Sequence, residues 1–274
     1  MVIGSGELMV LRQVGNVRYY TFDMFDSMGV TNAMITRSGG FSKKPYASLN
    51  VGGTVGDNPE LVRRNKDQAL MALNVSPRSI YDVWQVHGAD VVCTDRPRPD
   101  KETHKKADAI LTDQPGVNLF LRFADCVPIL LFDPIRRVIG LAHAGWKGTV
   151  LRTAAHAVIR MREVYGSIPA DIMAVIGPSI GQHHYEVGAV VETEVRRAFG
   201  AESSKVLRSS NGKNESGFQF DLWRANQIVL EQVGVQQIEI TGLCTACHLS
   251  DWYSHRAEGG NTGRFGALIA LWDE

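Results

Sequence analysis

The stretch that decides the fold is residues 117–146, VNLFLRFADCVPILLFDPIRRVIGLAHAGW. It holds three short apolar runs, which are separated by Ala-Asp-Cys-Val-Pro and by Asp-Pro-Ile-Arg-Arg. Short apolar runs bounded by Asp, Pro and Gly are typical of buried strands. The pattern therefore predicts strands at Asn118–Phe123, Ile129–Phe132 and Val138–Ala142.

Strands and helices alternate on both sides of this stretch. Asp57-Asn58-Pro59 combines a capping side chain with Pro at the first helical position, which predicts a helix running to about Leu73. Apolar residues recur at helical spacing from Lys147 to Tyr165. The other expected elements are strands at Tyr19–Phe22, Met34–Thr36, Tyr81–Val86, Ala109–Leu111, Ile172–Ile176, Ile238–Thr241 and Ala267–Leu271, helices at Ala189–Phe199 and Leu222–Val233, and a polar surface loop at Ser203–Gly217. With no long linker, one domain of mixed sheets covered by helices is expected.

Composition narrows the classes of partner. The chain has 274 residues, 44% of them apolar, and a formal net charge of +0. A neutral balance with scattered charges gives no reason to expect nucleic acid or an anionic membrane as a partner, so a small molecule is expected. The N-terminus lacks a signal-peptide pattern, and Arg122 and Asp125 interrupt the most apolar region. Four cysteines without such a signal predict reduced thiols and a cytoplasmic protein.

Three residues with soft donor atoms lie in short turn-like segments. His87 follows Gln-Val, Cys126 lies in Ala-Asp-Cys-Val-Pro, and His143 lies in Ala-His-Ala-Gly-Trp. Each comes at the end of an expected element, where a rigid scaffold presents functional side chains. Two imidazoles and one thiolate suit a zinc ion that keeps a fourth position open. Spacing alone equally allows three ordinary packed residues.

Several motifs in order make the chain similar to the YfiH-like family. These motifs are residues 36–42 (TRSGGFS), 48–50 (SLN), 85–89 (QVHGA), 107–109 (ADA), 124–128 (ADCVP), 142–146 (AHAGW), 176–180 (IGPSI) and 262–264 (TGR). The family was named after polyphenol oxidases (laccases), and its members are now regarded as purine nucleoside phosphorylases. The resemblance implies an α+β fold, with mixed β-sheets forming a sandwich decorated by helices. It also implies that residues 1–274 form a single catalytic domain.

The resemblance further implies an activity. The residues matching His87, Cys126 and His143 would bind a catalytic Zn2+. The expected reaction is phosphorolysis of adenosine, inosine or S-methyl-5′-thioadenosine, together with adenosine deamination. The expected partners are a purine nucleoside and inorganic phosphate, with no nucleic acid or membrane, and the expected state is a monomer or homodimer.

Phosphorolysis requires groups that bind an anion. Arg37, in a loop rich in glycine and serine, is the first candidate for binding phosphate. Lys147 and Arg256 are weaker candidates, because each could equally be a solvated surface charge. Asn50 is expected to orient the substrate, and Asp125 is expected to orient a metal ligand.

The oxidase name suggests copper as a second metal. A His2Cys set with a distant Met is also the blue-copper pattern. A multicopper oxidase needs a further cluster held mostly by His, and the eight histidines form no His-X-His pair. Genuine laccase activity is therefore not expected, and copper-dependent polyphenol oxidation stays only as an alternative to the zinc-dependent reaction.

A rival enzyme class uses Cys126 directly. The thiol could act as a nucleophile activated by His143 or His87, as in a hydrolase or deamidase. The family fold is shared with a toxin family that uses a Cys–His pair, which keeps this alternative open. Tightly bound zinc would argue against it, because a coordinated thiolate is a poor nucleophile.

Residues 244–248, CTACH, match the attachment pattern of a c-type haem. Covalent haem needs export, for which the sequence shows no signal. Cys244 and Cys247 could instead be a redox pair or half of a zinc site, but no second Cys-X-X-Cys completes it. Two reduced structural thiols are expected, and the role of His255 in the following Gly-rich segment is left open.

Overall fold

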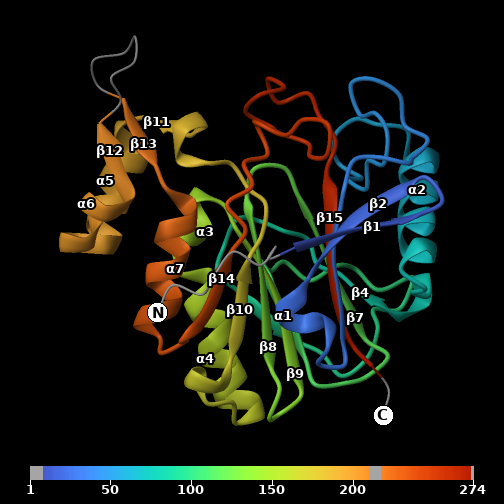
Figure 1. The fold of residues 1–274 in the computed structure, drawn as a ribbon, viewed down its shortest axis with the longest axis horizontal. Coiled ribbons are helices and arrows are strands. Elements are labelled where there is room, and N and C mark those ends of the chain that lie inside the picture. The colour runs from blue at the N-terminus through green and yellow to red at the C-terminus, as the bar shows by residue number, and fades with distance from the viewer. Residues whose placement is uncertain (1–8, 210–216, 273–274) are drawn as a thin grey trace.

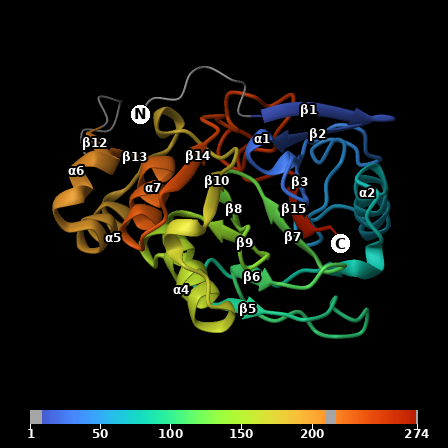
Figure 2. The ribbon, with the colours of Figure 1, turned by 60° about the horizontal axis from the view of Figure 1, so that its bottom comes forward.

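The computed structural model describes residues 9–209 and 217–272. Two six-stranded sheets, each with parallel and antiparallel pairs, pack face to face between layers of helices (Figures 1 and 2). The first sheet has the order β1 (Met9–Val14), β2 (Val17–Phe22), β3 (Val30–Ile35), β15 (Phe265–Leu271), β7 (Asn118–Phe123), β4 (Ile80–Tyr81). The second has the order β14 (Gln237–Ile240), β10 (Met173–Ile176), β8 (Val127–Asp133), β9 (Val138–Ala144), β6 (Ala109–Thr112), β5 (Val91–Cys93).

Helices cover the two outer faces of the sandwich. Helix α2 (Pro59–Ala72) packs on the first sheet, and α3 (Trp146–Val150), α4 (Thr153–Tyr165), α5 (Ala189–Phe199) and α7 (Leu222–Gln232) pack on the second (Figure 1). The remaining elements are α1 (Asp23–Asp26), α6 (Ser203–Val206), a small sheet of β11 (Glu186–Val187), β13 (Phe218–Phe220) and β12 (Leu207–Ser209), and 3-10 turns at Pro77–Ser79, Pro169–Asp171, Gln182–His184 and Gly200–Glu202. Within the described ranges, none of the helices combines the length and apolarity that a membrane crossing requires.

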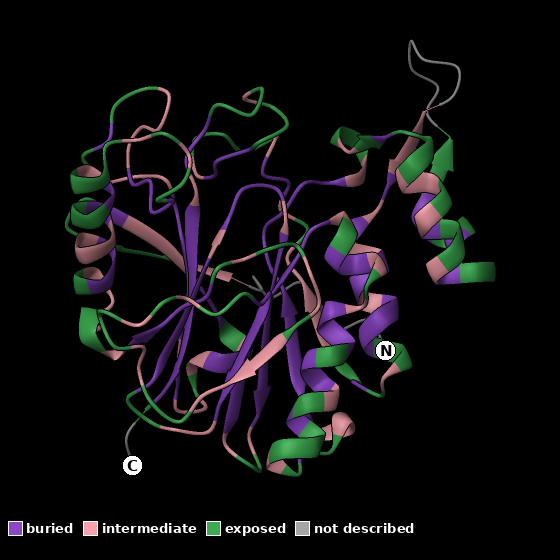
Figure 3. Cartoon of the chain, turned by 180° about the vertical axis from the view of Figure 1, so that it is seen from behind, coloured by how far each residue is buried: buried purple, intermediate pink, exposed green. Residues whose placement is uncertain are grey.

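The continuous apolar run of β8 is explained by burial on both faces. Leu130 and Phe132 face the first sheet, whereas Ile129 and Leu131 face the helices. Successive side chains of a strand point to opposite faces, so a strand covered on both sides is apolar at successive positions, as β8 is until Asp133 at its end. Figure 3 shows the central strands of both sheets as buried and much of the helices' outer surface as exposed. The mixed α+β fold expected from the sequence is confirmed.

The helix expected from Lys147 to Tyr165 is instead two helices. Helix α3 ends at Val150, and α4 begins at Thr153, after Arg152 at φ 62°. The Thr153 hydroxyl lies 2.8 Å from the Gly88 carbonyl and 2.9 Å from the Gly148 carbonyl. A left-handed residue cannot continue a helix, so the chain turns here although the apolar spacing persists.

One expected strand and one expected loop are shorter in the structure than the sequence predicted. The strand expected at Tyr81–Val86 shortens to β4, followed by an isolated bridge between Trp84 and Lys106. The expected loop Ser203–Gly217 begins with α6 and β12, because Val206 and Leu207 are buried against the helical core. Residues 210–216 of that expected loop lie outside the described residues.

Candidate functional site

Cys126 lies in the short connection that carries the chain from one sheet to the other. Strand β7 ends at Phe123 in the first sheet, and β8 begins at Val127 in the second. Asp125 takes φ 76°, a left-handed conformation that is uncommon outside glycine. Its carboxylate accepts hydrogen bonds from the Thr245 hydroxyl at 2.6 Å and from the Arg256 backbone N–H at 2.7 Å. These contacts hold the connection in a conformation that presents the Cys126 sulfur.

One carboxylate positions both histidines. Asp108 Oδ1 lies 2.9 Å from His143 Nδ1, and His143 is 3% exposed in β9. The same carboxylate accepts the backbone N–H groups of Val86, His87 and Gly88 at 3.2, 3.0 and 2.6 Å. Because Asp108 occupies Nδ1 of His143, the other ring nitrogen is the one that can face a metal.

The donor atoms of His87, Cys126 and His143 all lie within 4.8 Å of one another. The two imidazole rings are 4.9 Å apart between centroids and nearly perpendicular. Gly145 completes the packing, since a Cβ there would lie 2.7 Å from the Cys126 sulfur. His87 is exposed, Cys126 half-buried and His143 buried, so this three-residue cluster could hold a metal ion and opens towards solvent on one side.

The charges in this cluster are strongly coupled. Burial raises the pKa of Cys126, but the charge and hydrogen bond of His143, with a contribution from His87, outweigh it and lower the pKa to about 6. Burial lowers the pKa of His143, but Cys126 and Asp108 together raise it to about 9. Near neutral pH the metal-free cluster therefore pairs a thiolate with an imidazolium, and a metal ion must displace the imidazolium proton.

A cavity of about 780 Å³ opens over the cluster. Its walls include the exposed Trp84, together with Trp146, Tyr185 and Ile180. A cavity of this size and mixed lining is typical of sites for small organic molecules. The three-residue cluster thus faces a space that a small, partly polar ligand can fill.

One end of the cavity carries an excess of positive charge. The buried Asp82 carboxylate accepts from Arg98 at 2.9 Å and from Lys66 and His104 at 3.2 Å, and it also pairs with Arg122. Three permanent cations therefore surround one carboxylate. Lys66, Arg122 and His104 also line the cavity, which favours an anionic group there.

A further guanidinium lines the cavity near the cluster. Burial, the largest influence, lowers the pKa of Arg264, whereas the charges of Cys126 and Asp125 oppose that change. Its hydrogen bonds go to the backbone carbonyls of Thr262 and Gly263. A partly desolvated guanidinium of this kind is suited to binding an oxyanion.

Of the other residues singled out in the sequence, some line the cavity and some do not. Asp125 and Arg256 line the cavity, and the Arg256 guanidinium donates to the Glu186 carbonyl at 2.7 Å and stacks over Tyr185. Lys147 is exposed on α3 and does not line the cavity. Asn50 is fully buried and acts through the backbone, since its side-chain oxygen accepts the N–H of Arg264 at 2.8 Å.

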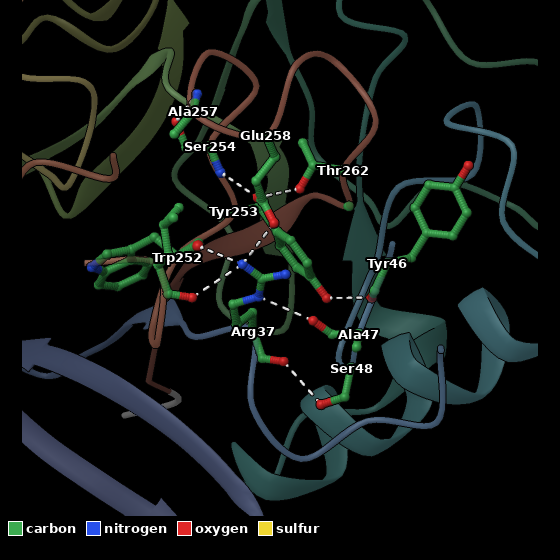
Figure 4. Close-up of polar contacts among 12 residues, drawn as sticks. Arg37, Tyr46, Ala47, Ser48, Trp252, Tyr253, Ser254, Ala257, Glu258 and Thr262 are labelled. Carbon is green, nitrogen blue, oxygen red and sulfur yellow. Dashed lines mark hydrogen bonds and ion pairs between the residues drawn. The ribbon is translucent and has the colours of Figure 1, made fainter. Parts of the chain in front are cut away.

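Arg37 does not line the cavity. Its polar contacts are to other parts of the protein (Figure 4). Its guanidinium donates to the Ala47 carbonyl at 3.0 Å and the Trp252 carbonyl at 3.2 Å, and it pairs with Glu258 at 3.1 Å. It also stacks 4.2 Å from the centre of the Tyr253 ring. These contacts use Nε and Nη1 of the guanidinium, and Arg37 does not line the cavity, so the expected phosphate role has no support in this geometry.

Several cations that line the cavity received no role from the sequence, among them Arg264 and Arg122. Arg264 was visible only as part of the motif Thr262-Gly263-Arg264, and Arg122 only as a charge that interrupts an apolar run. A charged residue inside a buried strand needs a partner, which was the available signal. The partner is Asp82, and only the fold brings Asp82 beside it.

The chain is similar to known proteins along most of its length. A family model described as multi-copper polyphenol oxidoreductase laccase matches residues 31–272. Purine nucleoside phosphorylase YlmD of Bacillus subtilis is 37% identical over 244 residues, which are 86% of this chain and 86% of that protein. A purine nucleoside phosphorylase of Deinococcus radiodurans is 38% identical over 245 residues, 89% and 90% of the two chains. The crystal structure of YlmD from Geobacillus stearothermophilus superposes with a TM-score of 0.89 at 33% identity, covering 98% of this chain and 100% of that one.

Proposed function

Because this chain belongs to the multi-copper polyphenol oxidoreductase laccase family, and because its relatives include proteins named purine nucleoside phosphorylases, we propose that it is a zinc-dependent purine nucleoside phosphorylase. Its substrates would be adenosine, inosine or S-methyl-5′-thioadenosine with inorganic phosphate, and residues 1–274 would form one catalytic domain. The observation that carries this proposal is the His87, Cys126 and His143 cluster at a cavity lined with cations.

The donor set fits the proposed metal. Two imidazole nitrogens and one thiolate, within 4.8 Å of one another and open on one side, suit a zinc ion that keeps one position for a ligand. Zinc bound to these three residues would supply a Lewis acid facing the cavity. Asp108 would fix the ring of His143 and the backbone at His87, so that both imidazoles keep their orientation when the cavity fills.

The cations would bind phosphate and hold it beside the sugar. In phosphorolysis an oxygen of phosphate forms a bond to C1′, the C1′–N9 bond breaks, and its electron pair passes to the purine, which takes up a proton. Arg264 and Arg256 are the proposed phosphate-binding residues, because both line the cavity near Asp125. Lys66 and Arg122 would add positive potential at the end of the cavity. Trp84 and Tyr185 offer aromatic surfaces for the purine.

Adenosine deamination is the second reaction proposed for this site. Here water adds to C6 of the purine and ammonia leaves, so the reacting carbon lies on the base instead of the sugar. The products separate the two reactions. Phosphorolysis of adenosine yields adenine and ribose 1-phosphate, whereas deamination yields inosine without consuming phosphate.

Product analysis with and without phosphate tests the proposal. We expect adenine release that requires phosphate, and we expect Arg264→Gln to raise the KM for phosphate at least tenfold. Arg160→Gln is the matched control, because Arg160 is exposed on α4 and pairs there with Glu163. Adenine release at the same rate without phosphate, or an unchanged KM in Arg264→Gln, would contradict the phosphate assignment.

The pairing of Cys126 and His143 supports one other candidate function. Thiolate, imidazolium and the Asp108 carboxylate form the line of nucleophile, base and orienting group that Cys–His hydrolases use. Turnover that survives chelation, together with rapid alkylation of Cys126 in metal-loaded protein, would favour that class. Efficient phenol oxidation with an intense thiolate-to-copper band would instead favour the copper oxidase that the family's description names.

A further inference from the structure

A second set of metal-ligand side chains lies outside the first cluster. His183 and His184 in the 3-10 turn Gln182–His184 face Cys244 and Cys247, which follow β14. One donor atom from each residue lies within 4.8 Å of all the others. The missing half of the Cys-X-X-Cys site is thus a pair of adjacent histidines.

The distances within this set match a tetrahedral centre. His184 Nδ1 lies 3.5 Å from the sulfur of Cys244 and 3.5 Å from that of Cys247, and His183 Nε2 lies 3.2 Å from the Cys247 sulfur. Ideal Zn–S and Zn–N bonds at tetrahedral angles place sulfur and nitrogen ~3.6 Å apart. His184 Nδ1 lies equally far from both cysteine sulfurs, whereas a single hydrogen bond would favour one of them. Equal distances are expected when all three atoms bind one metal ion.

Backbone contacts hold the two segments together before any metal binds. The Gly181 N–H donates to the Cys244 sulfur at 3.2 Å. Ser179 donates to the Leu243 carbonyl at 3.2 Å and accepts from the Thr245 N–H at 3.1 Å. The four ligands therefore project from a clamped pair of loops, which lowers the conformational entropy lost on binding a metal.

The surroundings of Cys244 and Cys247 argue against the two other roles considered for this pair, haem attachment and redox chemistry. His248, the histidine of the haem-attachment pattern, has its Nδ1 2.9 Å from the Cys244 carbonyl. Both cysteines are free thiols, and imidazole nitrogens lie beside their sulfurs. The sulfur atoms are thus placed as ligands of a shared centre.

We propose that His183, His184, Cys244 and Cys247 bind a second Zn2+ in a closed tetrahedral site. Four protein ligands leave no position for substrate, so this metal is structural. Ile180 and Tyr185 flank the histidine pair and line the cavity. Thr245, between the two cysteines, hydrogen-bonds to Asp125 beside Cys126. The second zinc thus ties together the loops that form one wall of the cavity.

Metal content of variants tests this site. Wild-type protein, purified with zinc under reducing conditions and then freed of loosely held metal on a desalting column, is expected to contain two zinc ions per chain. Cys247→Ser and His183→Ala should each contain one, and Cys126→Ser should also contain one. Cys93→Ser is the matched control, because Cys93 belongs to neither cluster, and it should keep both.

Cobalt substitution identifies which site remains. Cobalt-loaded Cys126→Ser should show the visible bands of a tetrahedral site and the stronger charge-transfer band of two thiolates. Cys247→Ser should retain only the weaker one-thiolate spectrum, and its Tm should fall. If Cys247→Ser proves insoluble, His183→Ala and the wild-type spectrum decide alone.

Three results would overturn the proposal. The first is one zinc per wild-type chain that His183→Ala and Cys247→Ser leave unchanged. The second is zinc that leaves on desalting, an adventitious ion only. The third is a disulfide between Cys244 and Cys247 in protein purified under reducing conditions, detected by mass spectrometry.

Discussion

Gly145 shows how closely single residues constrain the first cluster. A Cβ at this position would lie 2.7 Å from the Cys126 sulfur and 3.4 Å from the His87 ring. Real Cβ atoms essentially never come within 3.0 Å of another heavy atom in this way, so the Cys126 sulfur would have to move. The glycine of the Ala-His-Ala-Gly-Trp motif is therefore explained by the space that the Cys126 side chain needs.

Gly145→Ala should weaken metal binding at the first cluster, because the added methyl group displaces the Cys126 sulfur. We expect a loss of ~10-fold or more in affinity, comparable to changes in groups that orient metal ligands. Competition against a chromophoric chelator measures it. Gly188→Ala is the control, since a Cβ there meets no heavy atom within 4 Å. Equal affinities in the two variants would show that the close contact has no effect on binding.

Arg37→Ala should lower stability and leave phosphate kinetics unchanged. The guanidinium is 14% exposed and satisfies the carbonyls of Ala47 and Trp252 as well as Glu258. Its removal leaves these groups unpaired, at a cost of roughly 2–4 kcal/mol in the free energy of unfolding. Chemical denaturation measures this loss, and steady-state kinetics at low temperature measures the KM for phosphate. A raised KM in stably folded protein would return Arg37 to the phosphate site.

At the scale of elements, Asp108 connects β6, β9 and the loop that carries His87. Asp108→Asn retains the shape but replaces one accepting oxygen with a donor, so it cannot serve His143 and three backbone N–H groups together. We expect metal affinity to fall 10- to 100-fold. Isothermal titration with zinc measures this fall. An affinity equal to that of the wild type would mean that the histidines are oriented by packing alone.

Local sequence patterns predicted the strands and helices whose buried residues follow a clear pattern in the sequence. Strands β7, β8 and β9 were expected within a few residues, because apolar runs bounded by Asp and Pro report burial directly. The break at Arg152 was not predictable, since the apolar spacing continues through it and the turn depends on contacts to Gly88 and Gly148. The strand β1 was also missed, because its side chains are mostly exposed and carry no clear period.

The candidate site was predictable only in part, for a similar reason. Motif resemblance singled out His87, Cys126 and His143, which the fold brings together. It could not show that Arg37 lies outside the cavity lining, with its Nε and Nη1 bonded to backbone carbonyls and to Glu258. The histidine pair opposite Cys244 was not predicted, because the sequence contains no second Cys-X-X-Cys and only the fold brings the adjacent His183 and His184 from a distant segment.

At the scale of the whole molecule, the buried Asp82 makes stability depend on pH. Burial, the largest single influence, raises the pKa of this carboxyl. The hydrogen bond from His104 and the charges of Arg122 and Lys66 outweigh burial, so the pKa lies well below its ordinary value. The folded state therefore binds fewer protons here than the unfolded chain, and the resulting stability is present above about pH 4 and lost as the pH falls further.

Asp82→Asn should be less stable than the wild type at pH 6, with a difference that shrinks towards pH 3. The contribution of one such carboxyl changes by at most ~1.4 kcal/mol per pH unit. Urea unfolding at several pH values measures it. Asp67→Asn is the control, because Asp67 is 40% exposed in its pair with Arg63. A difference that stays constant over this range would contradict the assignment.

The central claim is that activity depends on a metal held by His87, Cys126 and His143. The most direct test measures zinc content and phosphate-dependent adenine release in the same preparations of wild type and Cys126→Ala. We predict that Cys126→Ala contains one zinc ion fewer per chain, has lost adenine release, and unfolds at a temperature close to that of the wild type. A folded Cys126→Ala with wild-type activity, or active wild-type protein that contains no metal, would contradict the claim.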